Sequence, residues 1–151
     1  MRSLYNYIIS TNSRYDNKVS VGSKELILNT EITERDYLFV NRIGTVINAP
    51  INIKTPIESG NEVIVHHNVF RRWYDVRGNE RNSGNYIKED TYTVSEEQIF
   101  AYKQNGKWHC PIQYCFVEPL GNEDVWSTDS EQKLIGKLTY TNDYLSSLGL
   151  S

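Results

Sequence analysis

Residues 57–72 read I-E-S-G-N-E-V-I-V-H-H-N-V-F-R-R, and this stretch decides the fold. A turn signal, Ser59-Gly60-Asn61, is followed at once by the apolar, β-branched run Val63-Ile64-Val65. A short run of this kind beside turn residues is typical of a buried strand that leaves a tight turn. The run ends at His66-His67, where a cluster of aromatic and basic residues begins. We therefore expect a strand of a small β-barrel whose outer end carries polar groups.

The composition of the 151 residues favours a folded, strand-rich protein. Hydrophobic residues make up 38% of the chain and charged residues 23%, so the chain has enough apolar surface to bury a core. Eleven tyrosines, three tryptophans and four phenylalanines stand against one methionine, and aromatic residues are enriched in strands. The net charge of -3 gives no general attraction to nucleic acid or to an anionic membrane.

The sequence carries no signal for membrane insertion or export. No apolar run approaches the length of a membrane span, and residues 1–6 lack the apolar core of a signal peptide. Cys110 and Cys115 are separated by P-I-Q-Y, a spacing outside the usual metal and redox motifs. In a reducing compartment they are most simply two small, half-buried side chains. We therefore expect a cytoplasmic protein with no membrane partner.

Short strand-like runs succeed one another through the first two thirds of the chain. Gly44 lies inside one of them, Arg42–Ile47, where it indicates a bulge or a close backbone approach at the corner of a small barrel. Ser95–Gln98 has the form of a capping box and favours one helical turn. The other expected strands are Tyr5–Ile9, Tyr37–Val40, Thr91–Val94 and Ile99–Tyr102.

A polar stretch from Ser10 to Ser20 predicts a long loop with little to bury. In the same connection, Leu26-Ile27-Leu28 is an apolar patch that follows Gly22-Ser23-Lys24 and precedes Asn29-Thr30-Glu31. Two interpretations remain open for this patch. It is either the apolar tip of an exposed loop or another strand of the core.

The pattern of the first strands then recurs in the last third of the chain. Residues 111–119 resemble the first strand in position and character, and residues 134–140 repeat the pattern of Arg42–Ile47. A repeated supersecondary unit is the physical inference. The second copy, residues 108–151, has no counterpart of Val63–Val65. Half a small barrel buries too little apolar area, so this copy is expected to lean on the first domain, a neighbouring subunit or further sequence.

In the order of these elements the chain resembles the GroES-type co-chaperonins, especially the divergent forms carried by tailed bacteriophages. Arg42–Ile47 looks like the R-G-x-V strand of that family, and Ile57–Val65 looks like its V-x-x-G-D-x-V-x-F turn and strand. Ser95–Tyr102 looks like its E-x-D-I-L-A closing turn and strand. Asn61 stands where the family usually has Asp. The resemblance runs from Tyr5 to Lys103.

The resemblance implies an all-β fold, with a small GroES-like barrel at residues 1–107 and an incomplete second barrel-like unit at residues 108–151. It implies a co-chaperonin that caps a GroEL-type chaperonin ring and assists ATP-dependent protein folding. Such a protein forms a heptamer-like ring of its own copies and works in the cytoplasm, which is the host cytoplasm if a phage encodes it. The docking residues would be Leu26, Ile27 and Leu28 on a flexible loop, although Lys24-Glu25 replaces the glycine pair of the family.

Residues 70–88 are longer and more basic than the usual connection of that family. Arg71, Arg72, Trp73 and Tyr74 combine cations with stacking rings, which is the surface chemistry of single-strand nucleic-acid binding. The alternative function is therefore a small-barrel nucleic-acid-binding or virion structural protein. The same residues also fit a hairpin that covers the barrel mouth or a contact between subunits. The acidic charge of the whole chain favours this second interpretation and makes nucleic acid an unlikely partner.

The sequence predicts no catalytic, metal or cofactor site. His66 and His67 are neighbours in an expected strand, where adjacent side chains point to opposite faces and cannot chelate one ion. No nucleophile stands in register with a base, and no glycine-rich loop suits a phosphate. We therefore expect a binding protein and not an enzyme.

Overall fold

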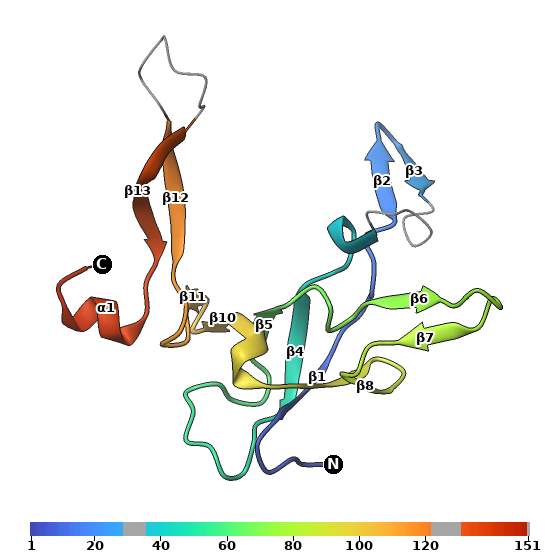
Figure 1. Cartoon of the computed structure of the whole chain (residues 1–151), viewed down its shortest axis with the longest axis horizontal. Coiled ribbons are helices and arrows are strands. Elements are labelled where there is room, and N and C mark those ends of the chain that lie inside the picture. Colours follow the sequence, from blue (N-terminus) through green and yellow to red (C-terminus); the bar gives the residue numbers. More distant parts are fainter. Residues whose placement is uncertain (29–35, 122–130, 151) are drawn as a thin grey trace.

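The computed structural model describes residues 1–28, 36–121 and 131–150, and these residues form a nearly all-β protein (Figure 1). All paired strands run antiparallel. The predicted all-β class is therefore confirmed. Within the described ranges, no helix is long and apolar enough to cross a membrane.

The main body is a seven-stranded sheet with the order β11-β10-β5-β4-β1-β9-β8. Its two outer strands, β11 and β8, do not pair with each other in the described part of the chain, so the sheet is open where the sequence predicted a closed barrel. Each outer strand is only three residues long and offers little edge for closure. The strands are β1 (Tyr7–Ser10), β4 (Ile43–Asn48), β5 (Glu62–Val65), β8 (Tyr86–Lys88), β9 (Thr91–Val94), β10 (Ile99–Gln104) and β11 (Lys107–His109).

The core lies on one face of this sheet. Val63 and Val65 alternate inward along β5 and are fully buried, as the apolar run predicted. Full burial of a side chain of this kind contributes about 1.5–3 kcal/mol. The ring of Phe70 meets the ring of Tyr92 edge-on at 4.8 Å between centroids. The large fully buried side chains in the described ranges are Tyr7, Ile9, Val46, Ile57, Val63, Val65, Val69, Phe70, Tyr92, Val94 and Ile99.

Gly44 lies where the backbone of β4 comes close to the backbone at the end of its antiparallel neighbour β1. A Cβ atom there would lie 3.0 Å from the carbonyl oxygen of Ser10 and 3.1 Å from the ring of Phe70. The close backbone approach predicted from the sequence is therefore confirmed. Gly60, at the start of the deciding stretch, has φ +91° and donates its amide to the Val46 oxygen at 2.7 Å. Glycine adopts this left-handed backbone without strain.

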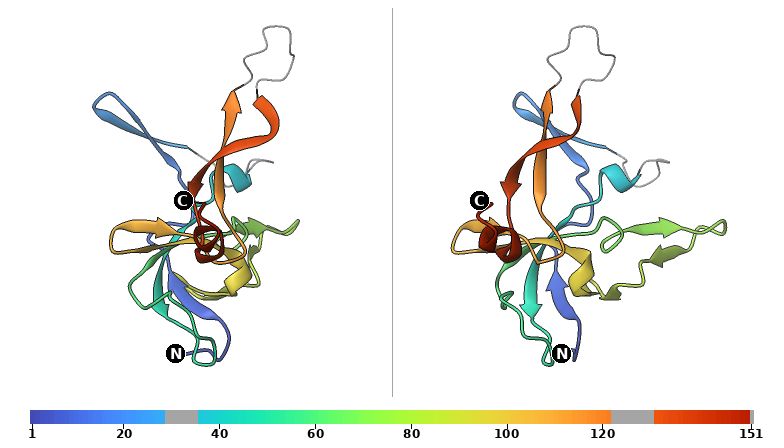
Figure 2. Two further views of the ribbon diagram at one scale, coloured as in Figure 1. Left: turned by 90° about the vertical axis from the view of Figure 1, so that its left-hand side faces the viewer. Right: turned by 60° about the vertical axis from the view of Figure 1, so that its left-hand side comes forward.

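Two hairpins project from the sheet in different directions (Figures 1 and 2). One is formed by β2 (Lys18–Val21) and β3 (Lys24–Ile27), and the other by β6 (Arg72–Tyr74) and β7 (Glu80–Asn82). Two single 3₁₀ turns complete this part, η1 (Asp36–Leu38) and η2 (Glu96–Gln98). The capping box predicted at Ser95–Gln98 is present at η2.

The strand predicted at Tyr37–Val40 is wrong. Tyr37 and Leu38 lie in η1, where the Phe39 amide bonds back to the Asp36 oxygen at 2.9 Å. Only Val40 pairs, through a single bridge with Tyr15. The Phe39 amide therefore donates to a local i to i+3 hydrogen bond and not to a neighbouring strand.

The C-terminal part is a long hairpin of β12 (Phe116–Gly121) and β13 (Glu131–Tyr140), followed by the helix α1 (Asp143–Ser147). Gly136 of β13 lies against the Glu118 oxygen of β12, as Gly44 lies against Ser10 in the first unit. The second barrel-like unit at residues 108–151 stays a prediction. The main sheet extends to His109, so the expected boundary after residue 107 falls inside β11.

Candidate functional site

The β2–β3 hairpin turns on Gly22-Ser23, with Gly22 at φ +63°. A two-residue turn with glycine at positive φ suits the twist of an antiparallel hairpin. The register pairs Val21 with Lys24 next to the turn and Lys18 with Ile27 at the other end. The tip is therefore Gly22-Ser23, and the predicted tip Leu26–Leu28 lies at the base of the hairpin. The flanking residues Asn29-Thr30-Glu31 lie outside the described residues.

The two faces of this hairpin differ in chemistry. Val19 stands directly opposite Leu26, and both lie on the same face as Val21, because side chains alternate along each strand. Leu28 continues this face by alternation, since its amide still bonds to the Asn17 oxygen at 2.7 Å. We call Val19, Val21, Leu26 and Leu28 the apolar face, and Lys24, the partner of Val21, lies on the same side at the turn end. The opposite face carries Lys18, Ser20, Glu25 and Ile27, with an ion pair of 3.3 Å between Lys18 Nζ and Glu25 Oε2.

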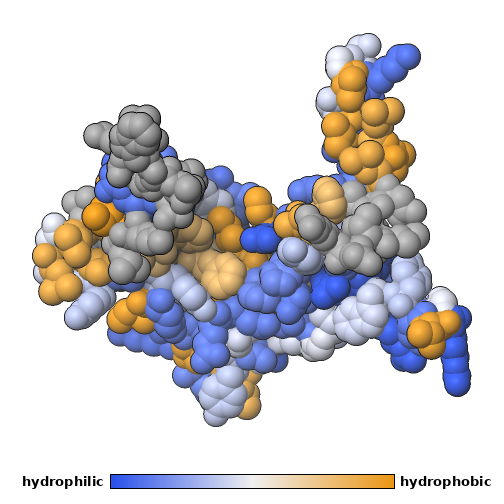
Figure 3. All heavy atoms as spheres, turned by 45° about the horizontal axis from the view of Figure 1, so that its top comes forward, coloured by the Kyte–Doolittle hydropathy of each residue, from blue (hydrophilic) through white to orange (hydrophobic). Residues whose placement is uncertain are grey.

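The apolar face is open to solvent, and Figure 3 shows hydrophobic side chains gathered on the projecting hairpin. The exposed fractions are 43% for Val19, 57% for Val21, 50% for Leu26 and 40% for Leu28. Ile27 is 77% exposed on the opposite face. The core-strand interpretation of this patch is therefore wrong. Exposed apolar surface of this kind makes the hairpin the candidate interaction site of the described residues.

Sequence reasoning found Leu26 and Leu28 but missed Val19, which pairs with Leu26, and Val21, which lies on the same face. The two valines are single apolar residues within a polar stretch and therefore looked like part of a loop. The alternation K-V-S-V directly before G-S was the available signal, because it is the pattern of one arm of a hairpin. The stretch Ser10–Ser20 is accordingly not a simple loop, since β2 begins at Lys18.

The predicted basic and aromatic residues 71–74 lie at the start of the second hairpin. Arg71 donates two hydrogen bonds to the carboxylate of Asp36, from Nε at 2.9 Å and from Nη2 at 3.0 Å. Arg72 Nη1 lies 3.4 Å from Glu80 Oε2 across the hairpin. Trp73 and Tyr74 are 45% and 49% exposed. The structure thus separates the four residues into two paired cations and two exposed rings.

Further arginines around this hairpin also have carboxylate partners. Arg14 Nη1 lies 3.5 Å from Glu80 Oε1, and Arg81 Nη2 lies 3.0 Å from Asp75 Oδ2. Hydrogen bonds hold the pKa of Asp75 below its ordinary value, first from the backbone amide of Asn79 and also from the Asn79 side chain and from Arg81. Asp75 therefore stays charged beside its arginine. Much of the positive charge that the sequence suggested is neutralised within the protein.

His66 and His67 lie side by side, with 4.2 Å between their ring centroids. The expectation of opposite faces is wrong because β5 ends at Val65 and the chain turns there, with the Val69 amide bonded to the His66 oxygen at 3.0 Å. Burial lowers the pKa of His67, and the neighbouring His66 and Arg42 lower it further. No group of three or more His, Cys, Asp or Glu side chains that could hold a metal ion occurs in the described ranges.

The cysteines differ in their surroundings. Cys110 is buried and Cys115 is exposed, and both are free thiols. Burial raises the pKa of Cys110 to about 11. The expectation of two half-buried side chains is therefore wrong for each of them, since Cys110 directly follows β11 of the main sheet and Cys115 directly precedes β12.

Comparison of the chain with models of protein families, with curated proteins and with solved structures gave no match.

Proposed function

We propose that this protein is a co-chaperonin that caps a GroEL-type chaperonin ring and docks through the apolar face of the β2–β3 hairpin. The three segments that resemble the family support this proposal by their arrangement. Arg42–Ile47 contains most of β4, Ile57–Val65 ends with β5, and Ser95–Tyr102 contains η2 and the start of β10. These strands are direct neighbours, since β4 pairs with β5 and β5 pairs with β10.

The observation that carries the proposal is the one-sided hairpin that stands off the sheet. Its four apolar side chains are roughly half exposed, so a groove that covers them would gain about 0.8–1.5 kcal/mol for each one. The total of about 3–6 kcal/mol would be reduced by the entropy of association, which leaves a weak single contact. A heptamer-like ring of copies would present several such hairpins at once and multiply weak contacts into useful avidity.

The mechanism is binding without chemistry. The chaperonin supplies the ATPase, and the co-chaperonin needs no cofactor, only a rigid body and an apolar segment that reaches a groove. A strand pair of this kind can lay its apolar face into such a groove while its polar face stays turned to solvent. The Lys18–Glu25 pair keeps that outer face soluble. The cytoplasm, where the chaperonin lies, is the compartment that this function requires.

The experiment compares the two faces of the same hairpin. Leu26→Ser and Val19→Ser each remove an apolar side chain from the docking face, whereas Ile27→Ser removes an equally apolar and more exposed side chain from the polar face. We expect Leu26→Ser and Val19→Ser to weaken binding to a chaperonin ring with ATP about tenfold or more, because several hairpins are affected at once. Ile27→Ser should weaken it much less.

Circular dichroism of each variant serves as the control, because these exposed residues contribute little to the fold. Equal losses for Ile27→Ser and Leu26→Ser would show that the hairpin does not bind by its apolar face. Unchanged binding in all three variants would show that the hairpin is not the docking element.

The exposed rings of Trp73 and Tyr74 support one alternative, a nucleic-acid-binding or virion structural protein that uses residues 70–88. Arg77 and Lys88 are the cations to test, since neither forms an ion pair in the described part of the chain. A mobility shift with single-stranded DNA that weakens with salt and is lost in the Arg77→Glu, Lys88→Glu variant would favour this alternative. The pairing of Arg71, Arg72 and Arg81 with carboxylates favours the co-chaperonin.

A further inference from the structure

We propose that Phe70–Ser83, which contains the second hairpin, is a brace that fixes the direction in which the β2–β3 hairpin projects. This inference rests on the proposed docking role of β2–β3. It assigns a role to the basic and aromatic segment that docking alone leaves unexplained. The brace acts on the root of the hairpin, which we define as residues 14–16 and 36–41.

The root is a short paired segment, in which residues 14–16 shortly before the hairpin lie against residues 36–41. The Asp16 amide bonds to the Phe39 oxygen at 2.8 Å, and the Asn41 amide bonds to the Arg14 oxygen at 2.9 Å. Tyr15 and Val40 form the single bridge between the two halves. This segment alone is too short to hold the direction of a projecting hairpin, because so small a ladder twists and frays easily.

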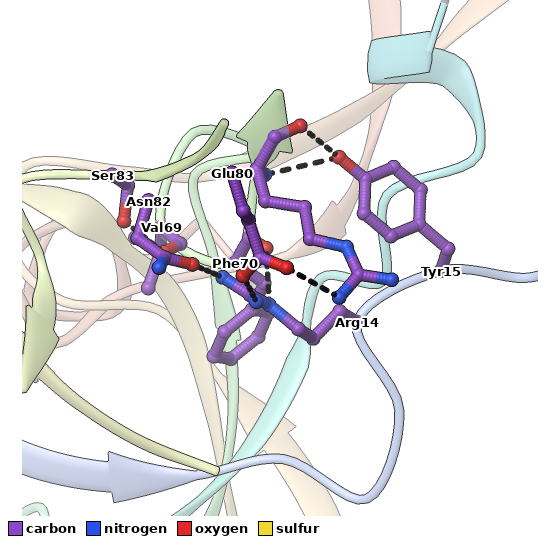
Figure 4. A network of polar contacts seen from close by, with 8 residues as sticks. Arg14, Tyr15, Val69, Phe70, Glu80, Asn82 and Ser83 are labelled. Atoms are coloured by element: carbon purple, nitrogen blue, oxygen red, sulfur yellow. Dashed lines mark hydrogen bonds and ion pairs between the residues drawn. The ribbon is translucent and has the colours of Figure 1, made fainter. Parts of the chain in front are cut away.

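The entering half of the root is tied to the brace by two consecutive side chains (Figure 4). Arg14 donates from Nε to the Phe70 oxygen at 3.2 Å and from Nη2 to the Asn82 side chain. Its side chain is only 15% exposed. Tyr15, which is 3% exposed, donates from Oη to the Arg72 oxygen at 2.8 Å and accepts from the Arg72 amide at 3.1 Å. Both residues thus form hydrogen bonds with the two ends of the brace and not with the turn at its tip.

The leaving half of the root is tied to the same brace by Asp36. Its carboxylate accepts hydrogen bonds from Nε and Nη2 of Arg71, and its side chain is only 6% exposed. A bidentate pair of this geometry fixes orientation as well as distance. The brace is itself fastened to the body, because Ser83 Oγ donates to the oxygen of the buried Val69 at 2.6 Å. The Ser83 amide donates to the Arg71 oxygen at 3.2 Å and joins the two ends of the brace.

Three side chains from both halves of the root therefore converge on one short segment. The arrangement gives Arg71 of the brace its carboxylate partner, Asp36, in the root. A hairpin that is already aimed loses less freedom when it docks, so the brace lowers the entropic cost of binding. Loss of the brace should widen the range of directions that β2–β3 samples without unfolding the sheet.

The first test needs no chaperonin. Spin labels are placed at Ser23→Cys, in the turn of the hairpin, and at Lys107→Cys, on the main sheet, in a Cys115→Ser background. Buried Cys110, whose pKa is about 11, reacts slowly with the label. The width of the distance distribution is then compared between the parent protein, Tyr15→Phe, Arg71→Gln and the control Arg81→Gln. Arg81 pairs with Asp75 farther along the same hairpin and does not touch the root.

We expect broader distributions for Tyr15→Phe and Arg71→Gln and an unchanged width for Arg81→Gln. Distance distributions of equal width in all four proteins would overturn the proposal that the brace fixes the direction of the hairpin. Tyr15→Phe keeps the buried ring, so it retains the fold even if Arg71→Gln loses stability by leaving Asp36 unpaired. Urea midpoints of the same variants identify any loss of the sheet itself.

The second test measures docking to a chaperonin ring with ATP. Tyr15→Phe should weaken binding on the order of three- to tenfold, because the freed hairpin must be ordered again on contact. Broader distributions with undiminished binding would overturn the role of the brace in docking. Absence of binding by the parent protein would refute the proposed function, and the distance measurement would still decide whether the brace exists.

Discussion

Two buried tyrosines offer a matched pair in which the same substitution should act in opposite directions. Tyr7 and Tyr92 are both fully buried in the core. Tyr7 Oη donates to Thr55 Oγ1 at 2.6 Å, whereas Tyr92 Oη has no hydrogen-bond partner in the described part of the protein. Burial raises the pKa of both hydroxyl groups, so both are neutral at physiological pH.

The magnitudes follow from what each hydroxyl does. A buried polar group without a partner costs about 1–3 kcal/mol, and Tyr92→Phe removes that group while the ring keeps its edge-on contact with Phe70. We expect Tyr92→Phe to raise the free energy of unfolding by about 1 kcal/mol, which corresponds to an increase in melting temperature of about 2–4 °C for a chain of this size. Tyr7→Phe should lower it by about 1–2 kcal/mol, because the hydrogen bond from Tyr7 Oη to Thr55 Oγ1 is then lost.

Urea unfolding followed by far-ultraviolet circular dichroism gives both values under one set of conditions. The slope of the transition should be the same for the two variants, so that the midpoints report stability alone. Equal destabilisation by Tyr92→Phe and Tyr7→Phe would refute the reasoning. It would mean that the Tyr92 hydroxyl makes a hydrogen bond as good as that of Tyr7, for instance to a buried water.

Two further predictions concern close packing and pH. Gly44→Ala should cost about 1–3 kcal/mol, because its Cβ atom would press on backbone and on the Phe70 ring, whereas Gly84→Ala, with no atom within 4 Å of the new Cβ, should be close to neutral. Stability should fall as the pH drops below about 6.5 toward the lowered folded pKa of His67, because only the unfolded chain takes up the proton in that window. Urea midpoints at pH 8 and pH 5 measure this loss of stability. A smaller loss in His67→Asn than in the parent protein would assign the effect to His67, and an equal loss would assign it to another group.

The strands of the sheet could be predicted wherever several residues repeat one pattern. Val63 and Val65 were placed in a buried strand by a run of β-branched residues, and Gly44 was placed at a close approach by its position inside another run. Local sequence is sufficient in these cases because the side-chain period and the backbone freedom of glycine act within a few residues. Closure of the sheet depends on the pairing of distant edges, which local patterns do not encode.

The candidate site was only partly predictable for a similar reason. Leu26 and Leu28 form an apolar patch in the sequence, but Val19, the partner of Leu26, and Val21 join their face only after the chain has turned at Gly22. The ties between the root and the brace are single polar residues separated by more than thirty positions. No periodic signal marks such contacts.

The most direct test of the proposed function is a native mass measurement of the full chain, alone and with a GroEL-type chaperonin and ATP. We predict that the chain alone forms a ring of several copies and that one such ring binds the end of the chaperonin when ATP is present. A chain that remains monomeric and forms no complex with the chaperonin under these conditions would contradict the proposal.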